Sequence, residues 1–182
     1  MSSQPINLLH LADIHIGIEN YGRLDSKSGL NSRVVDFLRR LSQAIDLALE
    51  REVDVCILAG DVYKNQRPNP TFQREFARRI KRLADHDVPV ILLVGNHDMA
   101  IADRAANSLD IFGVLDVPGV IVAAREEVHQ VTCRRDQPLQ VATVPYPQRS
   151  RLLAHSDFKN MTLEELDLEV GRMIYDFIAD DL

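Results

Sequence analysis

Three short apolar runs each end in polar side chains, and this repeated pattern constrains the fold of the chain more than any other feature. Short runs of Val, Ile and Leu bounded by Gly or Pro are typical of buried strands. In open α/β sheets, ligands bind just beyond the carboxyl ends of such strands. The runs and the groups that follow them are residues 6–11 with Asp13 and His15, residues 53–59 with Gly60 and Asp61, and residues 88–94 with Gly95, Asn96, His97 and Asp98.

The side chains at these three strand ends are metal-ligand types. Asp13 and His15 are two residues apart, so an extended chain places both on one side. A carboxylate has two oxygens, so Asp61 can bridge two cations, and Asn96 offers an amide oxygen. Mixed nitrogen and oxygen ligands suit manganese, iron or zinc better than calcium. The pattern therefore predicts a site for two metals.

Two metals about 3.5–4 Å apart can hold a phosphate and generate a nucleophile for an in-line displacement. An imidazole titrates near neutral pH, so His97 beside them could protonate the leaving oxygen. Each motif alone is weak evidence, since Asn-His-Asp after Gly is commonly just a turn. Three such motifs, in order and each ending an apolar run, are much more specific.

Some residues near these motifs allow a structural or a functional interpretation. His10 is expected to be a buried, hydrogen-bonded core histidine, with support of the metal ligands as the alternative. Tyr63 and Arg67 follow the bridging aspartate and could contact substrate, although surface-loop residues need no such role. An arginine-rich helix face is expected to be a solvated surface, with phosphate contact as the alternative. Its basic residues are Arg74, Arg78, Arg79, Lys81 and Arg82.

Composition limits the class of protein. A chain of 182 residues, 46% hydrophobic, can bury one substantial core, so a single domain is expected. The formal net charge of −6 gives no general attraction to nucleic acid or to anionic membranes. Cys56 and Cys133 are expected to be buried free thiols. No leader or membrane-spanning run is recognisable, so a cytoplasmic location without membrane contact is expected.

The remaining segments predict a parallel α/β half-sheet followed by smaller strands. A helix is expected over residues 31–51, and a second begins at Pro70 after the capping residue Asn69. The first helix has one apolar stripe, formed by Val34, Leu38, Leu41, Ile45 and Ala48. A short helix is predicted near residues 107–115. Strands near residues 120–123, 128–133 and 139–144 are close in sequence and are expected to pair as hairpins or a meander. Thr162 and Glu165 form a capping box that opens the last helix. The apolar stripe of that helix consists of Leu163, Leu166, Val170, Met173, Ile174 and Phe177.

The motifs D-x-H, G-D and G-N-H-D, in this order, resemble the signature of calcineurin-like metallophosphoesterases. Within that superfamily, residues 10–17, 58–63, 67–70 and 88–98 are similar to the nuclease subunit of bacterial SbcC–SbcD DNA-repair complexes. The resemblance implies an α/β sandwich of two sheets flanked by helices. It also implies a manganese-dependent DNA exonuclease and endonuclease that works with an SbcC-like coiled-coil ATPase, and homodimerisation.

The resemblance assigns roles residue by residue. Asp13 and His15 would bind the first metal, Asp61 would bridge, Asn96 would bind the second metal, and His97 would be the general acid. Asp98 would orient the turn or His97 and would not ligate.

The family pattern also has three later histidines, which neither His129 nor His155 matches. We therefore expect residues 1–182 to be the amino-terminal part of a nuclease domain, inactive alone. The alternatives are a phosphomonoesterase of the same superfamily and a catalytically inactive structural or interaction module.

Overall fold

The strands alternate with helices along the first two thirds of the chain, as the sequence predicts. The computed structural model describes residues 5–100, 105–147, 152–153 and 158–181, and His155 lies outside these ranges. The strands are β1 (Leu8–Leu11), β2 (Val55–Ala59), β3 (Val90–Leu93), β4 (Val120–Ala123), β5 (Glu127–Thr132) and β6 (Pro138–Thr143). The named helices are α1 (Ser32–Glu50), α2 (Pro70–Ala84), α3 (Asp110–Val114) and α5 (Leu163–Asp181).

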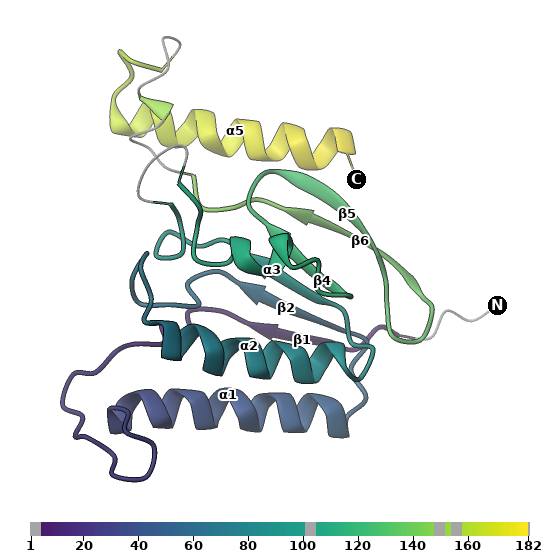
Figure 1. Cartoon of the computed structure of the whole chain (residues 1–182). Coiled ribbons are helices and arrows are strands. Elements are labelled where there is room, and N and C mark those ends of the chain that lie inside the picture. The colour runs from purple at the N-terminus through teal and green to yellow at the C-terminus, as the bar shows by residue number, and fades with distance from the viewer. Residues whose placement is uncertain (1–4, 101–104, 148–151, 154–157, 182) are drawn as a thin grey trace.

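A four-stranded parallel sheet with the order β1-β2-β3-β4 forms the centre of the molecule. Figure 1 shows α1 and α2 together on one side of this sheet, and the β5–β6 hairpin and α5 on the other. The α/β class with a parallel sheet and flanking helices is thereby confirmed. Because all four strands run in one direction, their carboxyl ends share one edge, where the three polar motifs lie.

The expectation that β4, β5 and β6 pair with one another as hairpins or a meander is wrong for β4. β4 pairs in parallel with β3, from Val90 opposite Val120 to Leu93 opposite Ala123, and α3 lies in the crossover between them. Only β5 and β6 pair as an antiparallel hairpin. The expectation rested on closeness in sequence, but an all-apolar strand such as Val-Ile-Val-Ala suits a parallel sheet better than a half-exposed meander.

The two long helices begin and face the sheet as their sequences predict. The Asn31 side chain accepts a hydrogen bond from Arg33 N at the start of α1, and Asn69 accepts one from Thr71 N at the start of α2. Side-chain oxygens at these caps satisfy amides that have no partner inside the helix. The buried face of α1 is the predicted stripe of Val34, Leu38, Leu41, Ile45 and Ala48.

The β5–β6 hairpin covers the face of the sheet opposite α1 and α2. Val131 and Cys133 pack there against Val55, Ile91 and Ala123. Cys56 and Cys133 are both free and buried, as predicted, and burial raises the pKa of the Cys56 thiol to about 12. A thiol that stays protonated is a poor nucleophile, so Cys56 serves packing.

The capping box of α5 is confirmed, but the helix packs less than its pattern suggests. Thr162 N donates to Glu165 Oε2 at 2.8 Å, and Glu165 N donates to Thr162 Oγ1 at 3.3 Å. Of its predicted apolar stripe, Leu166 alone is fully buried among the described side chains. Among the helices that the structure describes, none has the length and apolar character needed to cross a membrane.

A buried ion pair joins the hairpin to the amino end of β2 and predicts sensitivity to acid. Asp54 is fully buried, and its Oδ2 accepts a hydrogen bond from Asn7 N at 2.7 Å. The Arg135 guanidinium binds both oxygens of this carboxylate. The pKa of Asp54 is therefore lowered, chiefly by the hydrogen bond from Arg135. This contribution to stability is present above the unfolded-state pKa, about 4, and is lost as the pH falls through the lower folded-state value.

We expect Asp54→Asn to lower the free energy of unfolding at pH 7 by about 1.5–3 kcal/mol, the usual contribution of a hydrogen bond to a charged group. The difference between wild type and variant should shrink as the pH falls toward 3, and urea unfolding at several pH values measures it. Asp36→Asn is the control, because the Asp36–Arg39 pair is exposed and should contribute little. A difference independent of pH would contradict the assignment.

Candidate metal centre

Three loops meet at the carboxyl edge of the sheet, and hydrogen bonds hold them together. Asp13 N donates to Gly60 O at 3.2 Å, and His15 N donates to Asp61 O at 2.9 Å. The third loop is attached through a side chain, because His97 N donates to Asp61 Oδ1 at 3.0 Å. The convergence that the strand ends predict is therefore present in the structure.

The side chains on these loops form a compact group around Asp61. His15 Nε2 lies 3.5 Å from Asp13 Oδ1 and 3.8 Å from Asp61 Oδ2. Ligand atoms of His15, Asp61 and His97 all lie within 4.8 Å of one another. With its nitrogen turned toward Asp61, the Asn96 amide donates to Oδ2 at 2.9 Å and to Oδ1 at 3.2 Å. Asp61 thus contacts or closely approaches His15, Asn96 and His97.

The donor set fits divalent cations of the transition series. Two carboxylates, two imidazoles and an amide offer the mixed oxygen and nitrogen ligands that manganese, iron and zinc accept. Asp13 and Asn96 are exposed, whereas Asp61 is buried at the base of the group. An exposed rim over a buried carboxylate leaves room for a phosphate to approach from solvent.

The structure gives His97 a contact that its sequence motif alone did not predict. Its ring lies 5.0 Å from that of His15, centroid to centroid, at an interplanar angle of 86°. His97 is therefore a candidate ligand as well as the predicted general acid. The sequence places His97 directly after the predicted ligand Asn96, but the direction in which the His97 ring points depends on the path of the loop.

Three of the predicted ligands adopt a backbone conformation that L-residues rarely use. Asp13, His15 and Asp61 have φ angles of 53°, 48° and 53°. Asp and His enter this left-handed region more readily than most residues, at a cost of about 1–3 kcal/mol each. The residue types in these motifs tolerate this conformation, but they do not predict it. Strain gathered at one place is typical of functional sites.

The glycines of the G-D and G-N-H-D motifs allow two loops to touch. Gly60 has a φ of +86°, and a Cβ built on it would lie 3.0 Å from the Cα of Gly95. A side chain at either position would separate the loops that carry Asp61 and Asn96. Backbone contact therefore explains why glycine precedes the ligand in both motifs.

Asp98 lies behind the group and binds backbone. It is fully buried and accepts hydrogen bonds from Val62 N, Tyr63 N and Gly95 N. Burial raises the pKa of its carboxyl, while these amides act in the opposite direction. Of the two predicted roles, orienting the turn fits these contacts better than orienting the His97 ring.

Two expectations about neighbouring residues are wrong. His10 is exposed, because β1 lies at the edge of the sheet and the hairpin covers the same face of β2, β3 and β4 instead. Tyr63 cannot contact substrate, because it is fully buried and packs edge-to-face against Phe76. Arg67 is exposed in the same loop, so its predicted substrate contact stays a prediction.

The buried hydroxyl of Tyr63 leads to a prediction about stability. The Tyr63 Oη has no hydrogen-bond partner among the described residues, and burial raises the pKa of this phenol. Tyr63→Phe removes an unsatisfied polar group, so we expect the free energy of unfolding to stay equal or rise by about 1 kcal/mol. Tyr63→Ala should lower it by about 3–5 kcal/mol. Thermal unfolding measures both, and a clear loss in Tyr63→Phe would show that the hydroxyl is bonded.

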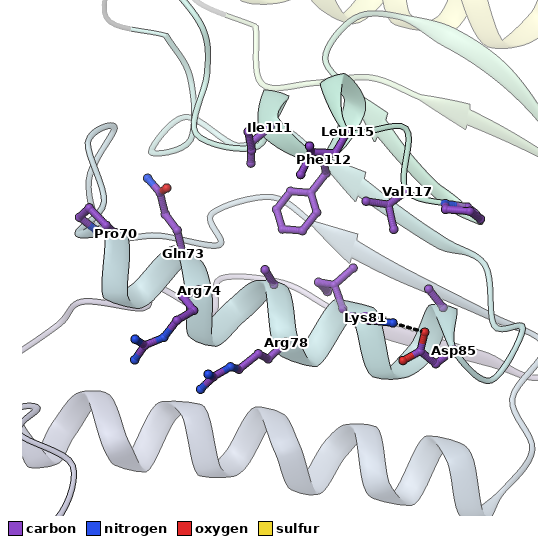
Figure 2. Close-up of a pocket in the computed structure, with 14 residues that line it drawn as sticks. Pro70, Gln73, Arg74, Arg78, Lys81, Asp85, Ile111, Phe112, Leu115 and Val117 are labelled. Atoms are coloured by element: carbon purple, nitrogen blue, oxygen red, sulfur yellow. Dashed lines mark hydrogen bonds and ion pairs between the residues drawn. The ribbon is translucent and has the colours of Figure 1, made fainter.

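A cavity away from the metal centre contains none of the predicted ligands. It has a volume of about 770 Å³ and lies between α2 and α3 (Figure 2). Arg74 and Arg78 of α2 are among the residues drawn around this cavity in Figure 2. Both arginines form ion pairs with Glu75, which favours the solvated-face interpretation of this helix.

Comparison with known proteins agrees with the geometry. The chain is 32% identical over 93 residues to the DNA double-strand break repair protein Mre11 of Sulfolobus acidocaldarius, covering 51% of the chain and 22% of that protein. It is 29% identical over 112 residues to the Mre11 of Archaeoglobus fulgidus, covering 61% and 24%. For the Mre11 of Saccharolobus solfataricus, the identity is 25% over 168 residues, covering 86% and 42%. The matches thus span between 22% and 42% of these relatives.

The family assignment rests on most of the chain. A family model described as calcineurin-like phosphoesterase matches residues 6–176, which include all three polar motifs. Proteins of this family are metal-dependent hydrolases, in agreement with the ligand group around Asp61. The chain therefore belongs to the calcineurin-like phosphoesterase family.

Proposed function

We propose that this chain contributes the metal centre of a nuclease that hydrolyses phosphodiester bonds in DNA during double-strand-break repair. The observation that carries the proposal is the position of Asp61, a buried carboxylate with His15, Asn96 and His97 gathered around it. The resemblance favours manganese as the metal, and the mixed oxygen and nitrogen ligands also allow iron or zinc. The names of the archaeal relatives support DNA as the substrate.

The roles are those that the family resemblance implies, and the grouping of His15, Asn96 and His97 around Asp61 supports them. Asp13 and His15 would hold one cation, Asn96 the other, and Asp61 both. When bound, the cations would offset the charge of the phosphodiester and make a water molecule acidic enough to attack near neutral pH. A ring nitrogen of His97 would give its proton to the leaving oxygen.

The partners proposed are DNA, an SbcC-like coiled-coil ATPase and a second copy of the chain in a homodimer. The ATPase and the homodimer rest on the resemblance to SbcC–SbcD nuclease subunits. A formal charge of −6 gives the chain no general attraction to DNA. Binding of substrate would therefore depend on the cations and on contacts supplied by partners.

The ligand set also predicts weak activity of this chain by itself. Two cations that share one bridging carboxylate would have fewer than four protein ligands each from Asp13, His15, Asp61, Asn96 and His97. His129 is engaged elsewhere, since its Nε2 lies 3.1 Å from Thr143 Oγ1. We therefore expect residues 1–182 to bind manganese weakly and to show little turnover alone.

The substrate assignment is tested on the protein purified with its natural partners. Labelled duplex DNA and nitrophenyl phosphate are each incubated with manganese, and a chelator serves as the control. We expect manganese-dependent cleavage of the duplex. Turnover of the monoester without cleavage of DNA would overturn the nuclease assignment. Metal binding without turnover of either substrate would favour a catalytically inactive interaction module.

His97→Gln separates the two roles open to this histidine. If His97 is the general acid, hydrolysis of DNA should fall by about 10²–10⁴-fold, because the leaving oxygen is strongly basic. Hydrolysis of bis-nitrophenyl phosphate should fall much less, since nitrophenolate leaves without a proton. Equal losses for both substrates, together with weaker manganese binding, would assign His97 as a ligand instead.

A further inference from the structure

A single buried carboxylate connects two of the loops that form the metal centre. Asp98 Oδ2 accepts hydrogen bonds from Val62 N at 3.1 Å and Gly95 N at 3.2 Å, and Oδ1 accepts one from Tyr63 N at 3.1 Å. Val62 and Tyr63 directly follow Asp61, and Gly95 directly precedes Asn96. The Asp98 carboxylate therefore holds the backbone on both sides of the contact between these two ligands.

A third segment is attached to the same residue. Ser108 N donates to Asp98 O at 3.0 Å, and Ser108 Oγ lies 3.3 Å from that oxygen and 3.5 Å from Asp98 Oδ1. Ser108 lies two residues before α3. Asp98 thus links the loop after β2, the loop after β3 and the segment that leads into α3.

These contacts suit a carboxylate and no other side chain of similar size. A buried charge is costly unless it is hydrogen-bonded, and the backbone amides supply that compensation. Asparagine has one acceptor oxygen and one NH₂ group, so its nitrogen would face either Tyr63 N or the pair Val62 N and Gly95 N. At least one buried amide would then lose its partner.

We propose that Asp98 is a positioning residue that fixes Asp61 relative to Asn96 and His97 before any cation binds. The inference rests on the proposed metal-dependent function and extends it to a residue that touches neither metal nor substrate. Asp61 adopts a strained φ of 53°, so its orientation needs support from its surroundings. The amides that follow Asp61, held by Asp98, supply that support.

The experiment compares Asp98→Asn with Asp54→Asn in the 182-residue chain. Both aspartates are fully buried and accept backbone hydrogen bonds, but Asp54 lies at the amino end of β2, and the metal centre lies at the carboxyl ends of the strands. Asp54→Asn therefore reports the loss of a buried carboxylate without any change at the metal centre. All measurements are made well below the melting temperature of each variant, so that every protein is folded.

Two quantities are measured. The first is hydrogen exchange of the His97 amide in metal-free protein, because this amide donates to Asp61 Oδ1. In Asp98→Asn we expect this exchange to accelerate roughly tenfold or more, with no change in Asp54→Asn. The second is manganese affinity by calorimetry, which should fall about 10–100-fold in Asp98→Asn and stay unchanged in Asp54→Asn.

The outcomes separate this inference from the proposed function. If the wild type binds no manganese, the proposed function fails, and exchange of the His97 amide alone decides whether Asp98 positions Asp61. Unchanged exchange in Asp98→Asn, or equal acceleration in both variants, overturns the inference. Manganese binding that is as tight in Asp98→Asn as in wild type also overturns it and leaves the proposed function intact.

Discussion

Replacing Gly95 with alanine is expected to disrupt the metal centre more than any other conservative change. A Cβ at this position would lie closer than 3.0 Å to both the backbone nitrogen and the carboxylate of Asp61. Neither group can move away freely, since the backbone is fixed by the sheet and the carboxylate is the proposed bridging ligand. Overpacking of this kind costs about 1–3 kcal/mol of stability. Displacement of reacting groups by 1 Å costs about a hundredfold in rate.

Gly171→Ala is the matched control for that variant. Gly171 lies in α5, where a Cβ would meet nothing within 4 Å. Alanine should therefore raise the free energy of unfolding by about 0.5–1 kcal/mol, because it restricts the unfolded chain and favours helix. Manganese binding by calorimetry and urea unfolding are measured on both variants. Wild-type metal affinity in Gly95→Ala would show that the two loops can separate without harm to the site.

The sequence predicted the elements whose pattern is local. The stripe along α1 could be read because its apolar residues recur at helical spacing and the helix packs one face on one sheet. The caps of α2 and α5 could be predicted for a similar reason, since Asn69 and Thr162 bond to amides within a few residues. Such features depend on contacts between residues that are close in the sequence, so a sequence pattern is enough to predict them.

Features that depend on distant neighbours could not be predicted in the same way. The place of β4 was missed because pairing with β3 depends on which sheet edge is free. The exposure of His10 follows from β1 being an edge strand that the hairpin does not cover. Tyr63 follows Asp61 in a loop and was expected to be accessible to substrate, but its ring is buried in the core against Phe76.

The candidate site shows both kinds of feature. That polar groups would meet at the carboxyl edge followed from the order of strands and motifs. The closeness of His97 to His15 depends on how the third loop bends, and that bend is held by hydrogen bonds from Gly95 and Ser108 to Asp98. A motif names the residues of such a loop but does not determine its path.

In the protein purified with its natural partners, Asp61→Asn is expected to abolish manganese-dependent hydrolysis while leaving the fold intact. The Asn oxygen can still accept the hydrogen bond from His97 N, and asparagine tolerates the left-handed backbone at this position. The variant loses the negative charge and the second oxygen, so it cannot hold two cations. The loss should exceed the about 10²–10³-fold cost of removing one electrostatic contact from an active site.

In the absence of metal, the free energy of unfolding of Asp61→Asn should equal that of the wild type or be slightly higher. Asp61 lies close enough to Asp98 to raise the pKa of that buried carboxyl, so removing its charge relieves repulsion. A gain in stability with a loss of activity is the behaviour of a residue retained for function. Asp87→Asn is the control, because Asp87 is exposed and has a similar φ of 57° but lies in the turn before β3. Asp87→Asn should retain hydrolysis, and if hydrolysis also survives in Asp61→Asn, the carboxylate of Asp61 does not bridge the metals.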